Sequence, residues 1–294
     1  EFRRVLFRSA LAEIMRPWCS GGHMTELDLV SIGIWSPLFP DWQSFSNGVN
    51  GGEWQESNLL KPEMIPPRER RRAPQSVKMA VEVLDQACTS AGIDPADAAV
   101  VFSSALGDMA ITDYMCRILA SHPRLVSPTK FHNSVHNATT GYWSIASHCH
   151  APTNAVSAHE YTAPMAFLEA ACQAAEDDIP VLLVTQEMAA PDALRVTCPA
   201  DTPFSMAILL TKPGVFDAAL ASLRFGASAK TIEPPSLSGD LGQSLRTNFG
   251  AVMLPLAIAI ADKAFMRGES PIHFEFPLAA ASCLSVELNP QRRS

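Results

Sequence analysis

Two neighbouring residues, His159 and Glu160, stand where a predicted strand meets a long predicted helix. The strand is Asn154–Ala158 (NAVSA), and an apolar helical pattern starts near Thr162. A helix N-terminus offers free N–H groups and positive potential, which lower the pKa of a thiol and stabilise an oxyanion. This junction is therefore where a nucleophile would be activated. The side chains present are an imidazole and a carboxylate. Neither residue is a cysteine or a serine, the usual nucleophiles at such a turn.

A carboxylate at this junction has little nucleophilic power. The N-terminus of the helix stabilises the anion, which makes Glu160 a weak nucleophile and a poor acid. We therefore expect Glu160 to have a structural role at the start of the helix.

Two pairs of histidines have spacings that zinc sites also use, i and i+4 for His132 and His136, and i and i+2 for His148 and His150. No nearby glutamate completes a His-Glu-x-x-His helix, and asparagines next to the first pair compete for its ring nitrogens. We predict hydrogen-bonded histidines near an interface, with no metal and no cofactor.

The chain has seven cysteines, an odd number with scattered spacing and no Cys-x-x-Cys motif. This usage predicts reduced, mostly buried thiols in a cytoplasmic protein. Cys149 and Cys172 are nearest the junction. Cys172 has core spacing on the long helix, and Cys149 precedes His150, so both are expected to be structural. A relocated nucleophile at Cys149 is the alternative.

Four arginines, Arg68, Arg70, Arg71 and Arg72, are clustered around Glu69. One interpretation is that they attract an acidic carrier protein or its phosphate. The other is that they are solvated side chains at the start of a helix. The whole chain has a net charge of −8, which argues against broad binding to nucleic acid.

The elements that must position these groups alternate between strand and helix, which predicts an α/β fold. Of the 294 residues, 47% are hydrophobic and 18% are charged, the balance of a globular domain. The expected strands are 27–34, 98–104, 154–158, 179–186, 204–211, 218–227, 271–276 and 280–288. The expected helices are 74–92, 108–121, 137–147, 252–267 and one that starts near 162.

Three further segments are distinguished by composition. Residues 35–67 are rich in Pro, Gly, Asn and Trp and predict a long irregular segment, and 227–242 predict a connection. The run 251–261 is too short to cross a bilayer, so no membrane span is expected. Residues 1–23 lack the apolar centre of a signal peptide, and we expect them to be a non-native tail before a domain over 24–294.

Four blocks carry a family resemblance: FHNSVHNATTGYWSIA, APTNAVSAHEYTAPMAFLEAACQAA, PVLLVTQE and TPFSMAILL. They resemble the β-ketoacyl synthases, and more closely the short chain-length-factor proteins of aryl polyene and related polyketide pathways. The resemblance covers about Leu27 to Leu288. In the synthases the second block contains the nucleophilic cysteine, and counting back from Leu168 places Glu160 at that cysteine position, flanked by His159.

The resemblance implies a thiolase-like αβαβα layered fold, shortened relative to a full ketosynthase. The family also has two catalytic histidines in its C-terminal half, whereas His273 is the one histidine after His159 in this sequence. It implies a non-catalytic partner that forms a heterodimer with a full-length ketosynthase, meets acyl carrier protein indirectly and shapes the acyl tunnel. The tunnel or interface candidates are Phe131, His132, His136, Asn137, Tyr142, Tyr161 and Met165.

Two alternatives remain open. The first is a stand-alone malonyl-thioester decarboxylase or acyltransferase that uses Glu160 or a relocated cysteine. The second is a homodimeric acyl-binding protein on the same fold, since such folds dimerise by joining their sheets.

Overall fold

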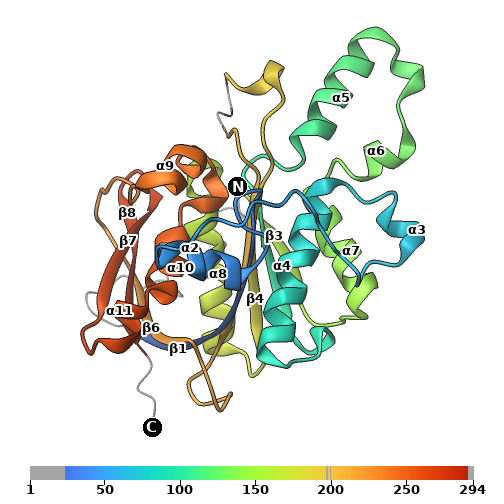
Figure 1. The fold of residues 1–294 in the computed structure, drawn as a ribbon. Helices are drawn as coiled ribbons and strands as arrows, with labels where there is room; N and C mark the ends of the chain where they lie inside the picture. Colours follow the sequence, from blue (N-terminus) through green and yellow to red (C-terminus); the bar gives the residue numbers. More distant parts are fainter. Residues whose placement is uncertain (1–23, 197, 199, 291–294) are drawn as a thin grey trace, which may run out of the picture.

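The computed structural model describes residues 24–196, 198 and 200–290 (Figure 1). The expected tail, 1–23, lies outside the described residues. Within them, eight strands form one mixed sheet in the order β3-β2-β4-β5-β1-β6-β8-β7.

The first five strands surround the junction. They are β1 (Thr25–Trp35), β2 (Ala99–Ser103), β3 (Thr153–Val156), β4 (Val181–Glu187) and β5 (Phe204–Thr211). β2 is parallel to β3 and β4, whereas β5 is antiparallel to β4 and β1. Every residue of β2, β4 and β5 is buried, as their continuous apolar sequences predict for strands covered on both faces.

Helices cover both faces of this five-stranded part (Figure 1). On one face lie α4 (Gln75–Ala91) and α7 (Ala138–Ser147), and on the other lie α2 (Trp42–Val49), α8 (Thr162–Glu176) and α10 (Leu254–Ala261). α4 ends at Gly92, whose left-handed φ of 68° suits glycine. Gly33 lets α4 pack closely on β1, because a Cβ there would overlap the Val83 carbonyl.

The last three strands are β6 (Ala221–Ser228), β7 (Ile272–Ala279) and β8 (Ser282–Pro290). β1 joins the two parts, since its first residues pair with β6 and its later residues pair with β5. The sheet curls so that β7 and β8 lie beyond α8 and α10 (Figure 1). The resulting layers are α, β, α and β, which confirms a thiolase-like α/β fold. A fifth layer would pack on the outward face of β6–β8–β7, which is polar.

Two segments differ from the sequence expectation. The segment 35–67 contains α2, which Asp41 caps by accepting a hydrogen bond from the Ser44 N–H, and Phe45 of α2 packs on Phe39 with ring centroids 5.0 Å apart. The helix expected over 252–267 divides at Asp262 into α10 and α11 (Lys263–Arg267), because the Asp262 side chain caps α11 by accepting from the Ala264 N–H.

Several short helices were not expected. They are α3 (Pro67–Arg70), α6 (Pro128–His132) and α9 (Gly239–Leu245), together with the 3₁₀ turns η1 (Pro95–Asp97), η2 (Pro123–Leu125), η3 (His159–Tyr161), η4 (Asp192–Leu194) and η5 (Phe249–Ala251). α9 begins inside the segment 227–242. None of these helices is long enough to show a hydrophobic period in the sequence.

Residues 108–132 form an arm that projects from the body (Figure 1). The arm consists of α5 (Met109–Ser121), η2 and α6. In α5 only Met109 and Ile111 are buried, and Leu119 and Leu125 are exposed apolar residues. The arm therefore has little packing of its own with the body.

Candidate functional site

A tight turn joins β3 to α8 and positions His159 and Glu160. His159 has a left-handed φ of 53°, a conformation that side chains other than glycine rarely adopt without strain. Thr162 holds the turn, because its hydroxyl accepts from the Ala158 N–H at 2.8 Å and donates to the His159 carbonyl at 2.7 Å. β3 ends at Val156, two residues earlier than expected.

Glu160 is exposed in η3, immediately before α8. A hydrogen bond to Glu160 is the main cause of the raised pKa of the Tyr161 hydroxyl. The ring of His159 packs on Phe249, with centroids 5.0 Å apart. The turn thus presents a carboxylate and a phenol to solvent, and one aromatic contact ties it to the C-terminal part of the chain.

A cavity of about 650 Å³ opens beside this turn, and we call it the elbow cavity. Glu160 and Tyr161 line it, together with Glu233, Arg246 and Phe249. The last three residues were not predicted, because they follow β6 in segments with no local motif. Their position is set by the curl of the sheet, which brings residues 231–252 back to the turn.

Among the described residues, no thiol lines the elbow cavity. Burial raises the pKa of Cys172 to about 11, and the charges of Glu169 and Glu176 add to this. Cys149 is buried and its thiol donates to the Ala98 carbonyl at 3.4 Å. Neither cysteine is placed as an activated nucleophile at the turn.

A second cavity, of about 770 Å³, lies between the arm, α7 and residues 65–72, and we call it the arm groove. Four of the expected tunnel or interface residues line it together: Phe131, His132, Asn137 and Tyr142. The groove also contains Val135 and Ile145. Phe131 is 63%, Val135 53% and Ile145 68% exposed, so a large apolar surface faces solvent.

The other three expected tunnel residues lie elsewhere. His136 lines a small pocket with Ser104 and Gln186, at the carboxyl ends of β2 and β4. Tyr161 lines the elbow cavity. Met165 lies on α8 and is 36% exposed. The seven residues therefore form no single site in this chain.

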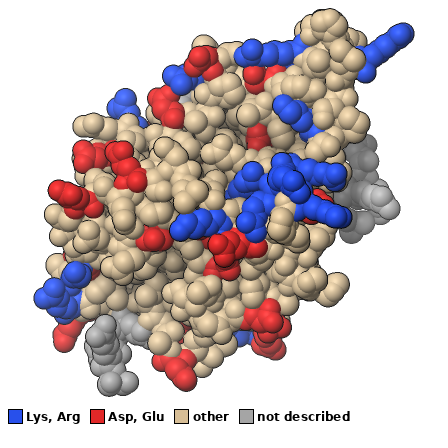
Figure 2. Space-filling view, turned by 45° about the vertical axis from the view of Figure 1, so that its right-hand side comes forward, with Lys and Arg blue, Asp and Glu red and all other residues tan. Residues whose placement is uncertain are grey.

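The arginine cluster divides into one structural residue and three exposed ones. Arg70 donates to the Ile65 carbonyl at 3.0 Å and to the Glu63 carbonyl at 2.8 Å, which holds the loop before α3. Arg68, Arg71 and Arg72 are exposed, and Arg72 also lines the arm groove. Figure 2 shows basic side chains gathered on this side of a molecule that is acidic overall.

The paired histidines are not part of a metal-binding cluster in the described residues. Across the described ranges, no group of three or more His, Cys, Asp or Glu side chains is placed to hold a metal ion. His148 is exposed in a left-handed conformation at the end of α7, and His132 contacts the amide oxygen of Asn133 at 3.2 Å. In the same part of the chain, no helix is long and apolar enough to cross a membrane.

Comparison with known proteins places this architecture in a family. Residues 42–246 match the model of the β-ketoacyl synthase N-terminal domain, which is well over half of the chain. The chain therefore belongs to the β-ketoacyl synthase family. No curated protein matches it in sequence.

Solved structures share its fold at low sequence identity. A chain of the complex between the ketosynthase ApeO and its chain length factor ApeC, from Xenorhabdus doucetiae, is 18% identical, with a TM-score of 0.61 over 90% of this chain and 99% of that chain. The ishigamide ketosynthase/chain length factor is 11% identical, with a TM-score of 0.67 over 90% and 99%. A type II polyketide ketosynthase in complex with its acyl carrier protein, AntDE:AntF, is 10% identical, with a TM-score of 0.69 over 92% and 100%.

Proposed function

We propose that this chain is a non-catalytic, chain-length-factor type subunit that pairs with an active β-ketoacyl synthase in fatty acid or polyketide-type, aryl polyene-like biosynthesis. The single observation that carries the proposal is Glu160, an exposed acid at the strand-to-helix turn, in a cavity lined by no thiol of the described residues. A carboxylate in this place cannot form the thioester through which a condensing enzyme holds its acyl chain.

The surface supports a partner subunit. Among the described strands, β3 lies at the edge of the sheet and is partly exposed, so one side of its backbone is available to pair with another strand. The exposed apolar residues Phe131, Val135 and Ile145 lie nearby in the chain, on α6 and α7 or between them. Surfaces of this kind are typical of interfaces that bury apolar side chains.

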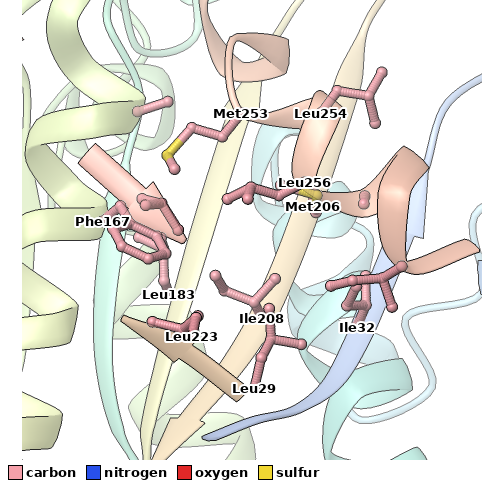
Figure 3. Packing of buried hydrophobic residues seen from close by; sticks show 14 of the residues in the cluster. Leu29, Ile32, Phe167, Leu183, Met206, Ile208, Leu223, Met253, Leu254 and Leu256 are labelled. Atoms are coloured by element: carbon pink, nitrogen blue, oxygen red, sulfur yellow. The ribbon is translucent and has the colours of Figure 1, made fainter. Parts of the chain in front are cut away.

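The interior is too tightly packed to hold an acyl chain, so a role in shaping a tunnel would fall to the surface. Beneath the turn, the core between α8, α10 and the sheet is filled by side chains such as Phe167, Met206 and Leu256 (Figure 3). The void that remains there is about 10 Å³, too small for an acyl chain. The arm groove, at about 770 Å³, has room for one. We infer that a partner covers the groove, which then becomes one wall of a tunnel with fixed length.

The exposed arginines fit an acidic partner at the same place. Arg72 lines the arm groove and shares a neighbouring pocket with Arg68 and Arg71. The three would attract an acyl carrier protein that delivers chains to the complex. Arg70 is less available for this role, because its Nε and one terminal nitrogen donate to backbone carbonyls.

Two measurements test the proposal. The purified chain is incubated with malonyl and acyl thioesters of a carrier protein and then analysed as an intact protein by mass spectrometry; we expect no acyl adduct. Co-expression with a cysteine-containing ketosynthase should give a heterodimer by size exclusion. A covalent acyl group on any side chain of this chain, or a stable monomer in the presence of its synthase, would contradict the proposal.

The product length gives a residue-level prediction. Ile145→Trp should fill the arm groove and shorten the products of the reconstituted complex by at least one two-carbon unit, because the wall moves inward. Leu119→Trp is the matched control, since Leu119 is also exposed but lies outside the groove. Equal product lengths from both variants would place the tunnel elsewhere.

One observation favours a second function. Glu160 shares the elbow cavity with Arg246, whose guanidinium could hold the carboxylate of a malonyl group. A stand-alone decarboxylase would turn over malonyl-carrier thioester as pure protein, and Glu160→Ala or Cys149→Ala would abolish this. Turnover that is absent, or unchanged in both variants, excludes it. A homodimeric acyl-binding protein is tested by native mass spectrometry without any synthase.

A further inference from the structure

A buried acid lies at the root of the arm. Glu187 is the last residue of β4 and only 2% exposed. Its carboxyl accepts hydrogen bonds from the backbone N–H of Ala105 and Leu106, and the Ser104 hydroxyl contacts it at 3.2 Å. All three partners belong to the short segment between β2 and α5. The acid therefore ties the carboxyl end of β4 to the segment from which the arm leaves the body.

The arm depends on this segment for its direction. The Ser104 hydroxyl also accepts from the Gly107 N–H at 2.9 Å, and Gly107 has a left-handed φ of 67°, which allows the sharp turn. Asp108 then caps α5 through the Ile111 N–H and accepts from the Ser76 hydroxyl on α4 at 2.8 Å. Since α5 buries only Met109, which packs on Ala190 and Ala200, and Ile111, these polar contacts act together with a small apolar cluster to hold the arm.

The surroundings of Glu187 contain few charges. The segment after β2 presents a hydroxyl and N–H groups, and the ring of His136 lies against its Gly107 and in one small pocket with Ser104. β5 presents Phe204 as the register partner, and η5 presents Gly250. The segment between β4 and β5 presents the Cys198 thiol, which Glu187 influences. Burial dominates over the hydrogen bonds and raises the pKa of Glu187 to about 8, with no charged neighbour among the causes.

We propose that Glu187 is a protonation-dependent positioning residue that holds the arm in place when neutral and releases it when ionised. An ionised carboxyl recovers its hydration only when the segment 104–107 moves away and water enters. Because the arm forms one side of the arm groove, release would alter the surface offered to a partner; this consequence rests on the proposed function, whereas the motion does not.

The size of the effect follows from linkage. The carboxyl has a pKa of about 8 when the segment is closed and near its ordinary value of 4.5 when water enters. The equilibrium constant for opening should then rise about a hundredfold between about pH 6 and about pH 9, and should level off above the closed-state pKa.

Hydrogen exchange of the full chain tests the motion without a partner. Protection factors of residues 108–132, corrected for intrinsic rates, should fall between about pH 6 and about pH 9. Glu187→Gln should remove this dependence, because the amide stays neutral while its oxygen still accepts from the Ala105 N–H. Glu169→Gln is the matched control: Glu169 accepts hydrogen bonds on α8, away from the arm, and its loss should leave the profile unchanged.

A second variant guards against misfolding. Ser104→Ala removes a hydrogen bond that lowers the pKa of Glu187, so the midpoint of release should move to higher pH. Equal pH profiles in the native chain and in Glu187→Gln, or an unmoved midpoint in Ser104→Ala, would overturn the proposal.

Partner affinity then separates this inference from the proposed function. If the heterodimer forms, its Kd should increase as pH rises in the native chain and stay constant in Glu187→Gln. A pH-dependent arm without any heterodimer would leave the positioning role standing and reject the proposed function. If the heterodimer forms but neither the protection factors of the arm nor the Kd change with pH, the positioning role alone is rejected.

Discussion

Two parts of one sheet face different environments. In β2, β4 and β5 every residue is buried, with helices on both faces. In β6, β8 and β7 buried residues alternate with polar ones, and the polar set faces outward. One outward row is made by Glu26, Arg224, Glu287 and His273, which are register neighbours across four strands.

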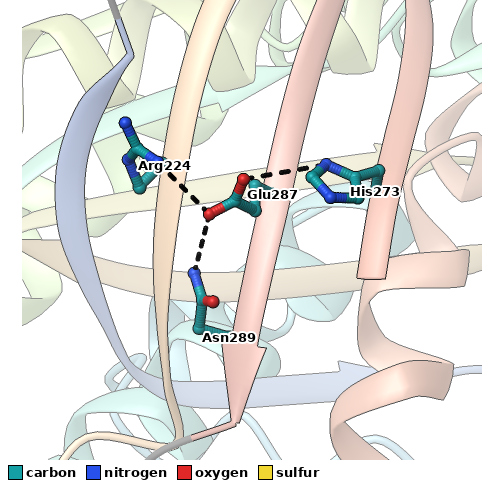
Figure 4. Close-up of polar contacts among 4 residues, drawn as sticks. All are labelled: Arg224, His273, Glu287 and Asn289. Carbon is teal, nitrogen blue, oxygen red and sulfur yellow. Dashed lines mark hydrogen bonds and ion pairs between the residues drawn. The ribbon is translucent and has the colours of Figure 1, made fainter. Parts of the chain in front are cut away.

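Figure 4 shows the central contacts of this row, which are made by Glu287. Glu287 lies between Arg224, at 3.5 Å, and His273, at 3.8 Å, and also accepts from the Asn289 amide at 3.3 Å. A surface of paired, partly exposed charges needs no covering layer. The strands around the strand-to-helix turn are thus covered on both faces, whereas the described C-terminal strands present one polar face.

The largest effect is expected where the two parts meet. Phe167 of α8 is fully buried between them and contacts Phe225 of β6 edge to face, with centroids 6.4 Å apart. Phe167→Ala should cost about 3–5 kcal/mol in the free energy of unfolding, from lost transfer energy and a cavity. Met165→Ala on the same helix is the control and should cost far less. Urea titration measures both, and equal losses would mean that the two strand layers do not share one core.

A smaller effect should come from pH in the doubly covered part. The pKa of Glu187 is about 8 in the folded chain and 4.5 as its ordinary value, so between these values the folded state holds a proton that the unfolded state releases. Stability therefore falls as pH rises through this window, by a few kcal/mol at most. Denaturant titrations from about pH 5 to about pH 9 should show the slope, and Glu187→Gln should flatten it. A slope that persists in the variant would assign it to other groups.

Sequence patterns predicted the doubly covered part well and the rest unevenly. Continuous apolar runs such as 204–211 define buried strands without ambiguity, and β5 has those bounds. Glu160 was placed at the turn because a strand and a helix flank it. Glu233 and Arg246 could not be predicted as neighbours of Glu160, because only the curl of the sheet brings them there. Glu187 follows directly on the expected strand 179–186, and its burial depends on a loop more than eighty positions away, which no local pattern predicts.

The smallest effect is expected on the outward face. Glu287→Gln removes one charge from a row in which Arg224 is 44% and His273 67% exposed, so water and salt screen the interactions. The cost should stay within about 1 kcal/mol and shrink further in high salt. A double-mutant cycle with Arg224→Ala isolates the pair, and a coupling above about 2 kcal/mol would show that the row is shielded from solvent. That result would mean that another layer, such as a partner subunit, covers β6–β8–β7, because a screened ion pair cannot couple so strongly.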